Sequence, residues 1–238
     1  LAAAFGGVLG PAMTMGLLFL SVLPSTVQSS IAFTSMAGGN VPAAICAASL
    51  SNIVGVVLTP LLVARLLHVD GGGVSLEAIE KIGIQILLPF VAGQMLRPLI
   101  GGFVRRHRLL TMVVDRGSIL LIVYSAFSGS TKSGLWSQIP VPSMVLSLVA
   151  VSVFLALAMA IMAATGRLMR MPQADQAVLF FCGSTKSLAT GLPMAGILFA
   201  GQDISLVILP LMIFHLLQLG VCAIISQRMA GRADLRPA

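Results

Sequence analysis

The sequence predicts an all-α, polytopic membrane protein. Of its 238 residues, 58% are hydrophobic and 9% are charged, whereas a soluble domain carries about a quarter charged residues. The apolar residues form continuous runs and do not alternate with polar ones, which favours membrane helices over a membrane β-barrel. The chain also contains 24 glycines, and small residues let membrane helices approach one another closely.

The membrane spans are placed by length, because about 20 apolar residues cross the hydrocarbon core. Residues 1–9 have the composition of the end of a helix, and the chain starts at Leu1 inside this apolar stretch. We therefore expect N-terminal helices to be missing from a single transporter domain, 1–238, with one partial span and about seven full ones. The expected full spans are residues 11–36, with a polar break, and 42–67, 76–96, 115–127, 142–164, 175–199 and 204–225.

The basic residues between these spans predict the topology. Ten Lys and Arg residues lie in the connection 97–116, the connection 167–170 and the tail after residue 225, against three in the alternate connections. Cytoplasmic loops carry such an excess, so we expect a cytoplasmic C-terminus and, in a bacterium, an inner-membrane location. The net charge of +7 reflects these clusters, and we expect the lipid bilayer and a small-molecule substrate, not nucleic acid, as partners.

Two polar interruptions divide the apolar sequence. The first is LPSTVQSSIAFTSMAGGN at residues 23–40, and the second is FFCGSTKSLATGLP at residues 180–193. Each combines hydroxyls, small residues and a proline at membrane depth, which is typical of the discontinuous helices that form transporter sites. Freed carbonyls at such a break can coordinate a cation, and freed amides can hold an anion.

Lys186 is the most informative residue of the second interruption. It lies eleven residues after Asp175 and thirteen before Phe199, so it falls near the membrane midplane, where a lysine cannot easily extend to the interface. Charged groups at this depth usually mark a substrate or ion pathway. Three roles stay open: the ammonium replaces a bound cation between helix ends, it loads and releases a proton, or it pairs with an anionic substrate.

The other candidate residues are polar side chains at membrane depth. Asn40 follows two glycines and also fits a tight turn; Asn52 also fits an interhelical hydrogen bond. His215 and Gln218 share one helix face, as a packing pair or as part of a proton relay. The candidate substrate- and ion-binding residues are Gln28, Ser29, Ser30, Asn40, Ser49, Asn52, Ser184, Thr185, Lys186, Ser187, His215 and Gln218.

Catalytic and metal-binding motifs are absent from the sequence. It contains no paired membrane acids, no His-Glu metal motif and no nucleophile-base pair at a telling spacing. The three cysteines lie in apolar segments without metal-ligand spacing. We therefore expect no enzyme and no cofactor, with Na⁺ or H⁺ as the candidate coupling ion.

The runs PSTVQSSIAFTSMAGGNVPAAI, STKSLATGLPM and VILPLMIFHLLQL resemble the bile acid:sodium symporter superfamily. The resemblance is to its bacterial branch, which is related to the seventh member of human solute carrier family ten, and it covers essentially the whole chain. It implies ten helices arranged as a core and a panel domain. It also implies two discontinuous helices that cross near the midplane, beside sodium and substrate sites. On this pattern the chain holds the end of helix three and helices four to ten.

The sodium ligands of the bile acid branch are only partly matched. Its Ser-Asn pair in helix four corresponds to Ser29 and Ser30, and its two hydroxyls in helix five fall near Ala44 and Ala48. Its acidic residue in helix nine corresponds to about Phe180. The resemblance therefore implies a sodium site without its acid.

The positive charge in this region belongs to a side chain of the protein. Lys186 stands six residues after the position of the missing acid, and a candidate Na⁺ position remains near Ser29, Ser30 and Ser184. The resemblance implies a secondary active transporter that moves a small organic anion by alternating access. The alternative is a non-transporting membrane regulator of ion (calcium) or lipid homeostasis.

Overall fold

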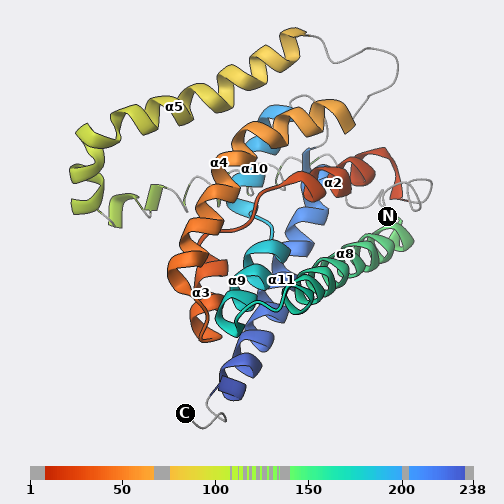
Figure 1. Ribbon diagram of the computed structural model, residues 1–238. Helices are drawn as coiled ribbons and strands as arrows, with labels where there is room; N and C mark the ends of the chain where they lie inside the picture. Colours follow the sequence, from red (N-terminus) through yellow and green to blue (C-terminus); the bar gives the residue numbers. More distant parts are fainter. Residues whose placement is uncertain are drawn as a thin grey trace.

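The fold is helical throughout the part of the chain that the structure, a computed structural model, describes (Figure 1). This part comprises residues 9–66, 76–107, 140–199 and 204–233, with scattered positions between 109 and 134. No strand occurs in it. The helices are α2 (Pro11–Val22), α3 (Gln28–Met36), α4 (Val41–Leu66), α5 (Leu76–Arg106), α8 (Val141–Leu168), α9 (Gln173–Ser184), α10 (Leu188–Leu198) and α11 (Ile204–Ala233).

Three helices in the described residues are long and apolar enough to cross a membrane. These are Val41–Val63 of α4, Val141–Leu168 of α8 and Ile204–Ala230 of α11. Helix α2 is apolar but too short to cross alone. The predicted all-α, multi-pass membrane class is thus confirmed, whereas the count of about seven spans and the division into core and panel domains stay predictions.

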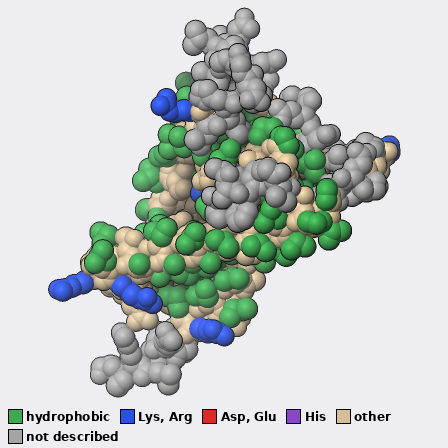
Figure 2. Space-filling model, turned by 90° about the vertical axis from the view of Figure 1, so that its right-hand side faces the viewer, with side chains coloured by type: hydrophobic (Ala, Val, Ile, Leu, Met, Phe, Trp, Pro, Cys, Tyr) green, Lys and Arg blue, Asp and Glu red, His purple; other side chains and the backbone are tan. Residues whose placement is uncertain are grey.

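Helix α8 shows why this chain folds in lipid. It buries small and hydroxyl residues such as Ser143, Ser147 and Ala150, and it exposes Val145 and Leu148. A helix of a soluble protein has the opposite pattern, whereas membrane helices put small residues at their interfaces and apolar ones toward lipid. Figure 2 shows one face covered mostly by hydrophobic side chains, with most of the visible Lys and Arg side chains at its margins.

Helix α11 is the central element of the assembly. It packs against α2, α3, α8 and α10, while α9 packs against α3, α4 and α8 (Figure 1). The fully buried aromatic residues Phe19, Phe181 and Phe214 come from α2, α9 and α11. The core therefore combines buried side chains of α2, α9 and α11, and α4 packs against α2, α3 and α9.

Both predicted interruptions are breaks in a helix. Helix α2 ends at Val22, and the chain is extended at Leu23, because the residue before a proline disfavours the helical conformation. Helix α9 ends at Ser184, and the extended residues Thr185 and Ser187 precede α10. The structure therefore contains the pairs α2–α3 and α9–α10 as two discontinuous helices.

The end expected for the span 76–96 is wrong, because α5 continues through Arg97 and Pro98 to Arg106. The helices α8 and α11 also extend beyond their expected spans, to Leu168 and Ala233. The ends of α5, α8 and α11 differ from the expected ones for the same physical reason. An apolar run reports the thickness of the hydrocarbon, whereas backbone hydrogen bonding lets a helix continue into the headgroup region and beyond.

Several sequence expectations lie outside the described residues. They are residues 1–8 of the expected partial span, the connection between the expected spans 42–67 and 76–96, and the tail after 233. The expected span 115–127 is described only at scattered positions.

The contact of α2 with α11 yields a test of the fold. A Cβ atom on Gly16 would collide with the carbonyl oxygen of Val207 and touch the ring of Pro210, and backbone cannot move aside as a side chain can. We expect Gly16→Ala to lower the free energy of unfolding by about 1–3 kcal/mol, the usual effect of overpacking, measured as a lower melting temperature in detergent.

Gly220→Ala is the matched control, because nothing lies within 4 Å of a Cβ at Gly220 of α11. Alanine has a higher helix propensity than glycine, so this variant should melt at the wild-type temperature or above. Equal melting temperatures for the two variants would contradict the close contact of α2 with α11.

Candidate functional site at the crossing of two broken helices

The two breaks touch each other. The backbone N–H of Ser187 donates to the carbonyl of Pro24 at 2.9 Å. Beside this contact the Oγ1 atom of Thr185 lies 2.7 Å from the Oγ of Ser30 and 3.1 Å from the Oγ of Ser25. These hydroxyls are buried, with Ser30 at 0% and Thr185 at 1% exposure. The crossing is therefore held by backbone and hydroxyl hydrogen bonds between segments about 160 residues apart in the sequence.

Lys186 binds the end of α2 at this crossing. Its Nζ donates to the carbonyl oxygens of Ser21 at 3.0 Å and of Leu23 at 2.8 Å. The last carbonyls of a helix have no partner within the helix and carry the negative end of its dipole. A cation placed there satisfies both the hydrogen-bonding and the electrostatic requirement.

The other carbonyls of the break also have donors. The hydroxyl of Thr59 donates to Val22 at 2.8 Å, and the amide of Asn52 donates to Ser25 at 2.8 Å. With Lys186 on its two carbonyls and Ser187 on Pro24, each carbonyl from residue 20 to residue 25 has a donor. Unpaired backbone groups at membrane depth are strongly unfavourable, and this complete set of partners explains how the break is tolerated.

Gln218 of α11 holds the backbone of Lys186 from the other side. Its Oε1 accepts from the N–H of Lys186 at 2.8 Å, and its Nε2 donates to the carbonyl of the same residue at 2.8 Å. The Nε2 also lies 2.9 Å from Nδ1 of His215, one turn earlier on α11. The pair that the sequence placed on one helix face is thus directed at Lys186.

Asn52 joins α4 to the second break. Its Oδ1 accepts from the hydroxyl of Thr190 at 3.1 Å. Ser187 caps α10, because its Oγ accepts from the N–H of Thr190 at 3.1 Å. Asn52 therefore contacts both discontinuous helices, and the predicted interhelical hydrogen bond is present.

Asn40 lies away from the crossing, at the start of α4. Its Oδ1 accepts from the N–H of Ala43, and its Nδ2 donates to Asp175 in the first turn of α9 at 2.9 Å. Its own N–H donates to the carbonyl of Ala174. Asn40 thus fixes the start of α4 against the start of α9.

Four other predicted site residues take a smaller part. Gln28 and Ser49 are exposed. Ser29 bonds to its neighbour Thr26, and Ser184 donates to Phe180 within its own helix at 2.6 Å. The structure brings Ser30, Asn52, Thr185, Lys186, Ser187, His215 and Gln218 together, and it leaves these four outside the set.

Some residues of the crossing were not among the predicted ones. Ser25 lies in the same polar break as Ser30, and Thr190 follows the cap residue Ser187 at the capping distance, so both carried a signal. Thr59 gave none, because a lone threonine in an apolar span more often bonds within its own helix. Asp175, which lies away from the crossing, gave none either, since its partner Asn40 lies far away in the sequence.

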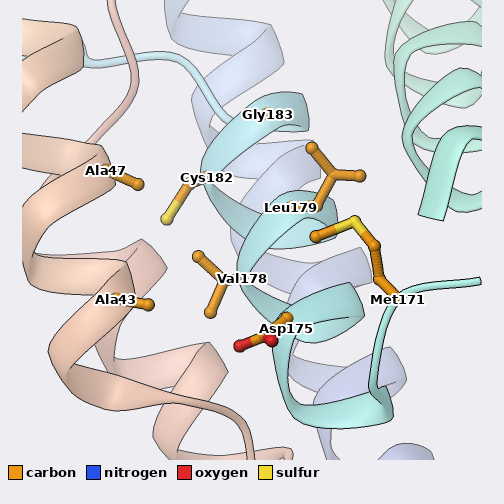
Figure 3. A pocket seen from close by; sticks show the side chains of 8 residues that line it. All are labelled: Ala43, Ala47, Met171, Asp175, Val178, Leu179, Cys182 and Gly183. Atoms are coloured by element: carbon orange, nitrogen blue, oxygen red, sulfur yellow. The ribbon is translucent and has the colours of Figure 1, made fainter. Parts of the chain in front are cut away.

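A cavity of about 420 Å³ lies between α4 and α9 (Figure 3). It runs from Asp175, in the first turn of α9, to Gly183 near the end of that helix. Figure 3 shows the side chains of Val178 and Cys182 facing the alanines of α4, with the carboxylate of Asp175 at one end. The lining residues are Ala43, Ala47, Met171, Asp175, Val178, Leu179, Cys182 and Gly183.

Three of the positions that correspond to sodium ligands offer a sodium ion no side-chain oxygen. Ala44 and Ala48 are fully buried and offer no side-chain oxygen. Phe180 packs edge-to-face on Phe181, with ring centroids 5.1 Å apart. No group of three or more His, Cys, Asp or Glu side chains gathers in the described residues. The positive charge at the crossing is instead the ammonium of Lys186.

Known proteins similar to the chain come from bacteria and vertebrates. The "Uncharacterized protein PA2026" of Pseudomonas aeruginosa is 50% identical over 232 residues, which are 97% of this chain and 70% of that protein. The "Putative symporter YfeH" of Escherichia coli is 47% identical over 218 residues, 92% of this chain and 66% of that protein. The "Sodium/bile acid cotransporter 7" of Rattus norvegicus is 30% identical over 203 residues, 84% of this chain and 59% of that protein.

The chain thus spans less than two thirds of the length of the last two relatives. A family model, the SBF-like CPA transporter family, matches residues 1–231. The predicted resemblance is confirmed by both findings, and the chain belongs to the SBF-like CPA transporter family, a family of transporters and not of enzymes.

Proposed function

We propose that the chain forms the transport core of a secondary active transporter of a small organic anion, working by alternating access. The observation that carries this proposal is the crossing itself. Two discontinuous helices meet there, and a lysine neutralises the end of one of them. Discontinuous helices whose ends face a cation are how many secondary transporters build their sites.

The role proposed for Lys186 is that of a resident cation. Its Nζ is bonded to two carbonyls of α2, and it is not among the side chains that line the cavity. Of the three roles left open by the sequence, these contacts favour replacement of a bound cation over direct pairing with an anionic substrate. On this proposal sodium has no vacant site to fill, and a proton is the coupling ion.

The cavity between α4 and α9 is proposed as the cytoplasmic entrance. Arg167 lies in the last turn of α8 and Arg170 in the connection from α8 to α9, and basic connections are cytoplasmic. Asp175, in the first turn of α9, then lies near the cytoplasmic surface, and Cys182 is about 10 Å deeper at 1.5 Å per residue. The support for an anionic substrate is the resemblance together with the name of the rat relative, a sodium/bile acid cotransporter. A bacterial inner-membrane location with a cytoplasmic C-terminus completes the proposal.

The test of transport uses the full-length protein in proteoliposomes, with a panel of labelled carboxylates that includes a bile acid. We expect uptake of at least one anion, and a fall to below about a tenth of the wild-type rate in Lys186→Met. This variant keeps most of the aliphatic chain but leaves the carbonyls of Ser21 and Leu23 unpaired. It should also lose about 2 kcal/mol of stability, the size of a hydrogen bond to a charged group.

Lys132→Met is the matched control, because Lys132 is exposed. It should retain wild-type uptake and melting temperature. Uptake that is unchanged in Lys186→Met would exclude Lys186 from the transport mechanism. If no anion were taken up by a correctly inserted protein, the regulator alternative would be favoured.

The cytoplasmic entrance can be tested with the native cysteines. Within these 238 residues, Cys46→Ser and Cys222→Ser leave only Cys182, which lines the cavity, and any cysteine elsewhere in the full-length protein is also replaced by Ser. We expect a charged methanethiosulfonate reagent to modify Cys182 at least about tenfold faster in inside-out vesicles than in right-side-out vesicles, because the cavity opens on the cytoplasmic side.

A protein with only Cys222, which is fully buried, supplies the control and should react slowly from both sides. Faster reaction of Cys182 from the outer side would reverse the proposed direction of the entrance.

A further inference from the structure

We propose that His215 is the proton-binding residue of the crossing, and that Gln218 is the positioning residue through which its protonation state controls Lys186. Neutral His215 locks the backbone of Lys186 to α11, and a proton on Nδ1 of His215 releases it. The inference rests on the proposed function only for the use of this release in transport.

The orientation of the Gln218 amide is fixed by the backbone. The N–H of Lys186 can only donate, so the atom that faces it at 2.8 Å must be Oε1. The carbonyl of Lys186 can only accept, so the atom that faces it at 2.8 Å must be Nε2. Reversing the amide would place its NH₂ group against the N–H of Lys186 and its oxygen against the carbonyl of Lys186. Both hydrogen bonds would then be lost.

This orientation also fixes the form of His215. The Nε2 of Gln218 carries two hydrogens; one is used by the carbonyl of Lys186, and the other faces Nδ1 of His215 at 2.9 Å. Nδ1 must therefore accept, which requires a neutral imidazole with its hydrogen on Nε2. The amide of Gln218 thus joins His215 to Lys186, with one hydrogen facing the carbonyl of Lys186 and the other facing Nδ1 of His215.

Protonation of His215 is incompatible with this arrangement. A hydrogen on Nδ1 would face the hydrogen of Gln218, so either the two side chains separate or the amide reverses and gives up both bonds to Lys186. Gln218 is fully buried, and water cannot readily replace the lost partners. His215 itself is only half-buried, and its open side is the proposed route of the proton. Acid is therefore expected to unlock the backbone of Lys186.

The helices around His215 carry few titratable side chains that could offset the charge of a proton on its ring. The segments α2, α3 and α10, which pack on α11, contain no titratable side chain. The remaining neighbour, α8, carries Arg167 in its last turn. The next helix, α9, carries Cys182 and Asp175, and Asp175 is bonded to Asn40. On α11 itself Cys222 is buried, and Arg228 and Arg232 lie near the end.

Lys186 is thus the charged group linked to His215, and it is a cation bound to α2. Two positive charges in one desolvated crossing repel each other. A proton on His215 therefore acts in the same direction twice: it breaks the hydrogen bonds of Gln218 and it opposes the ammonium of Lys186.

The direct test is amide hydrogen exchange of the peptide that contains Lys186 and Ser187, expressed as protection factors at pH 8 and pH 5.5. In the wild-type full-length protein we expect protection to fall at least about tenfold at the lower pH, because two hydrogen bonds are lost. His215→Asn keeps an acceptor in place of Nδ1 and cannot titrate, so it should retain the pH 8 protection at both values.

His107→Asn is the matched control, because His107 is exposed at the end of α5, and it should respond as the wild type does. Equal wild-type protection at the two pH values would overturn the proposal, and so would a full pH response in His215→Asn.

A second measurement avoids dependence on the folding of His215→Asn. His68→Asn and His107→Asn leave His215 as the one histidine of these 238 residues; with any histidine elsewhere in the full-length protein also replaced by Asn, ¹⁵N-histidine NMR reports the form of His215. We expect the neutral Nε2–H tautomer at pH 8, and the Nδ1–H tautomer would overturn the proposal. Both measurements need no substrate. A protein that shows the switch but transports no anion would refute only the proposed function.

Discussion

The structure depends on one interaction, the contact of the Lys186 ammonium with the last carbonyls of α2. A helix that stops inside a membrane exposes carbonyls and the negative end of its dipole to a medium that solvates neither. Lys186 supplies two donors and a positive charge at that point. The break in α2, the direction of α3 and the crossing with α9–α10 all require that this end be satisfied.

The crossing links four structural elements through a few polar residues. Lys186 binds α2 with its side chain and α11 with its backbone. Asn52 connects α4 to both breaks, and Thr185 joins the hydroxyls of the first break to the end of α9. Because buried polar networks are fully satisfied in one arrangement only, such a crossing has discrete states. That property suits a protein that alternates between two conformations.

The sequence predicted the parts of the site whose signal is local. Polar residues beside a proline or a glycine in an apolar run identified both breaks, and the rarity of membrane lysines identified Lys186. Partners remote in the sequence could not be found this way. Nothing in the sequence directs Gln218 to the backbone of Lys186 or Asn40 to Asp175, because those contacts arise only when the helices pack. The end of α5 was missed because hydropathy reports membrane thickness and not helix length.

The central claim is that the Lys186 ammonium occupies the electrostatic role of a bound sodium ion. The most direct measurement is the melting temperature of the full-length protein in matched sodium, potassium and choline salts. A ligand that binds only the folded state raises stability with the logarithm of its concentration. The account predicts the same melting temperature in all three salts at equal ionic strength. A rise that is specific to sodium and grows with its concentration would show an occupied sodium site and would contradict the claim.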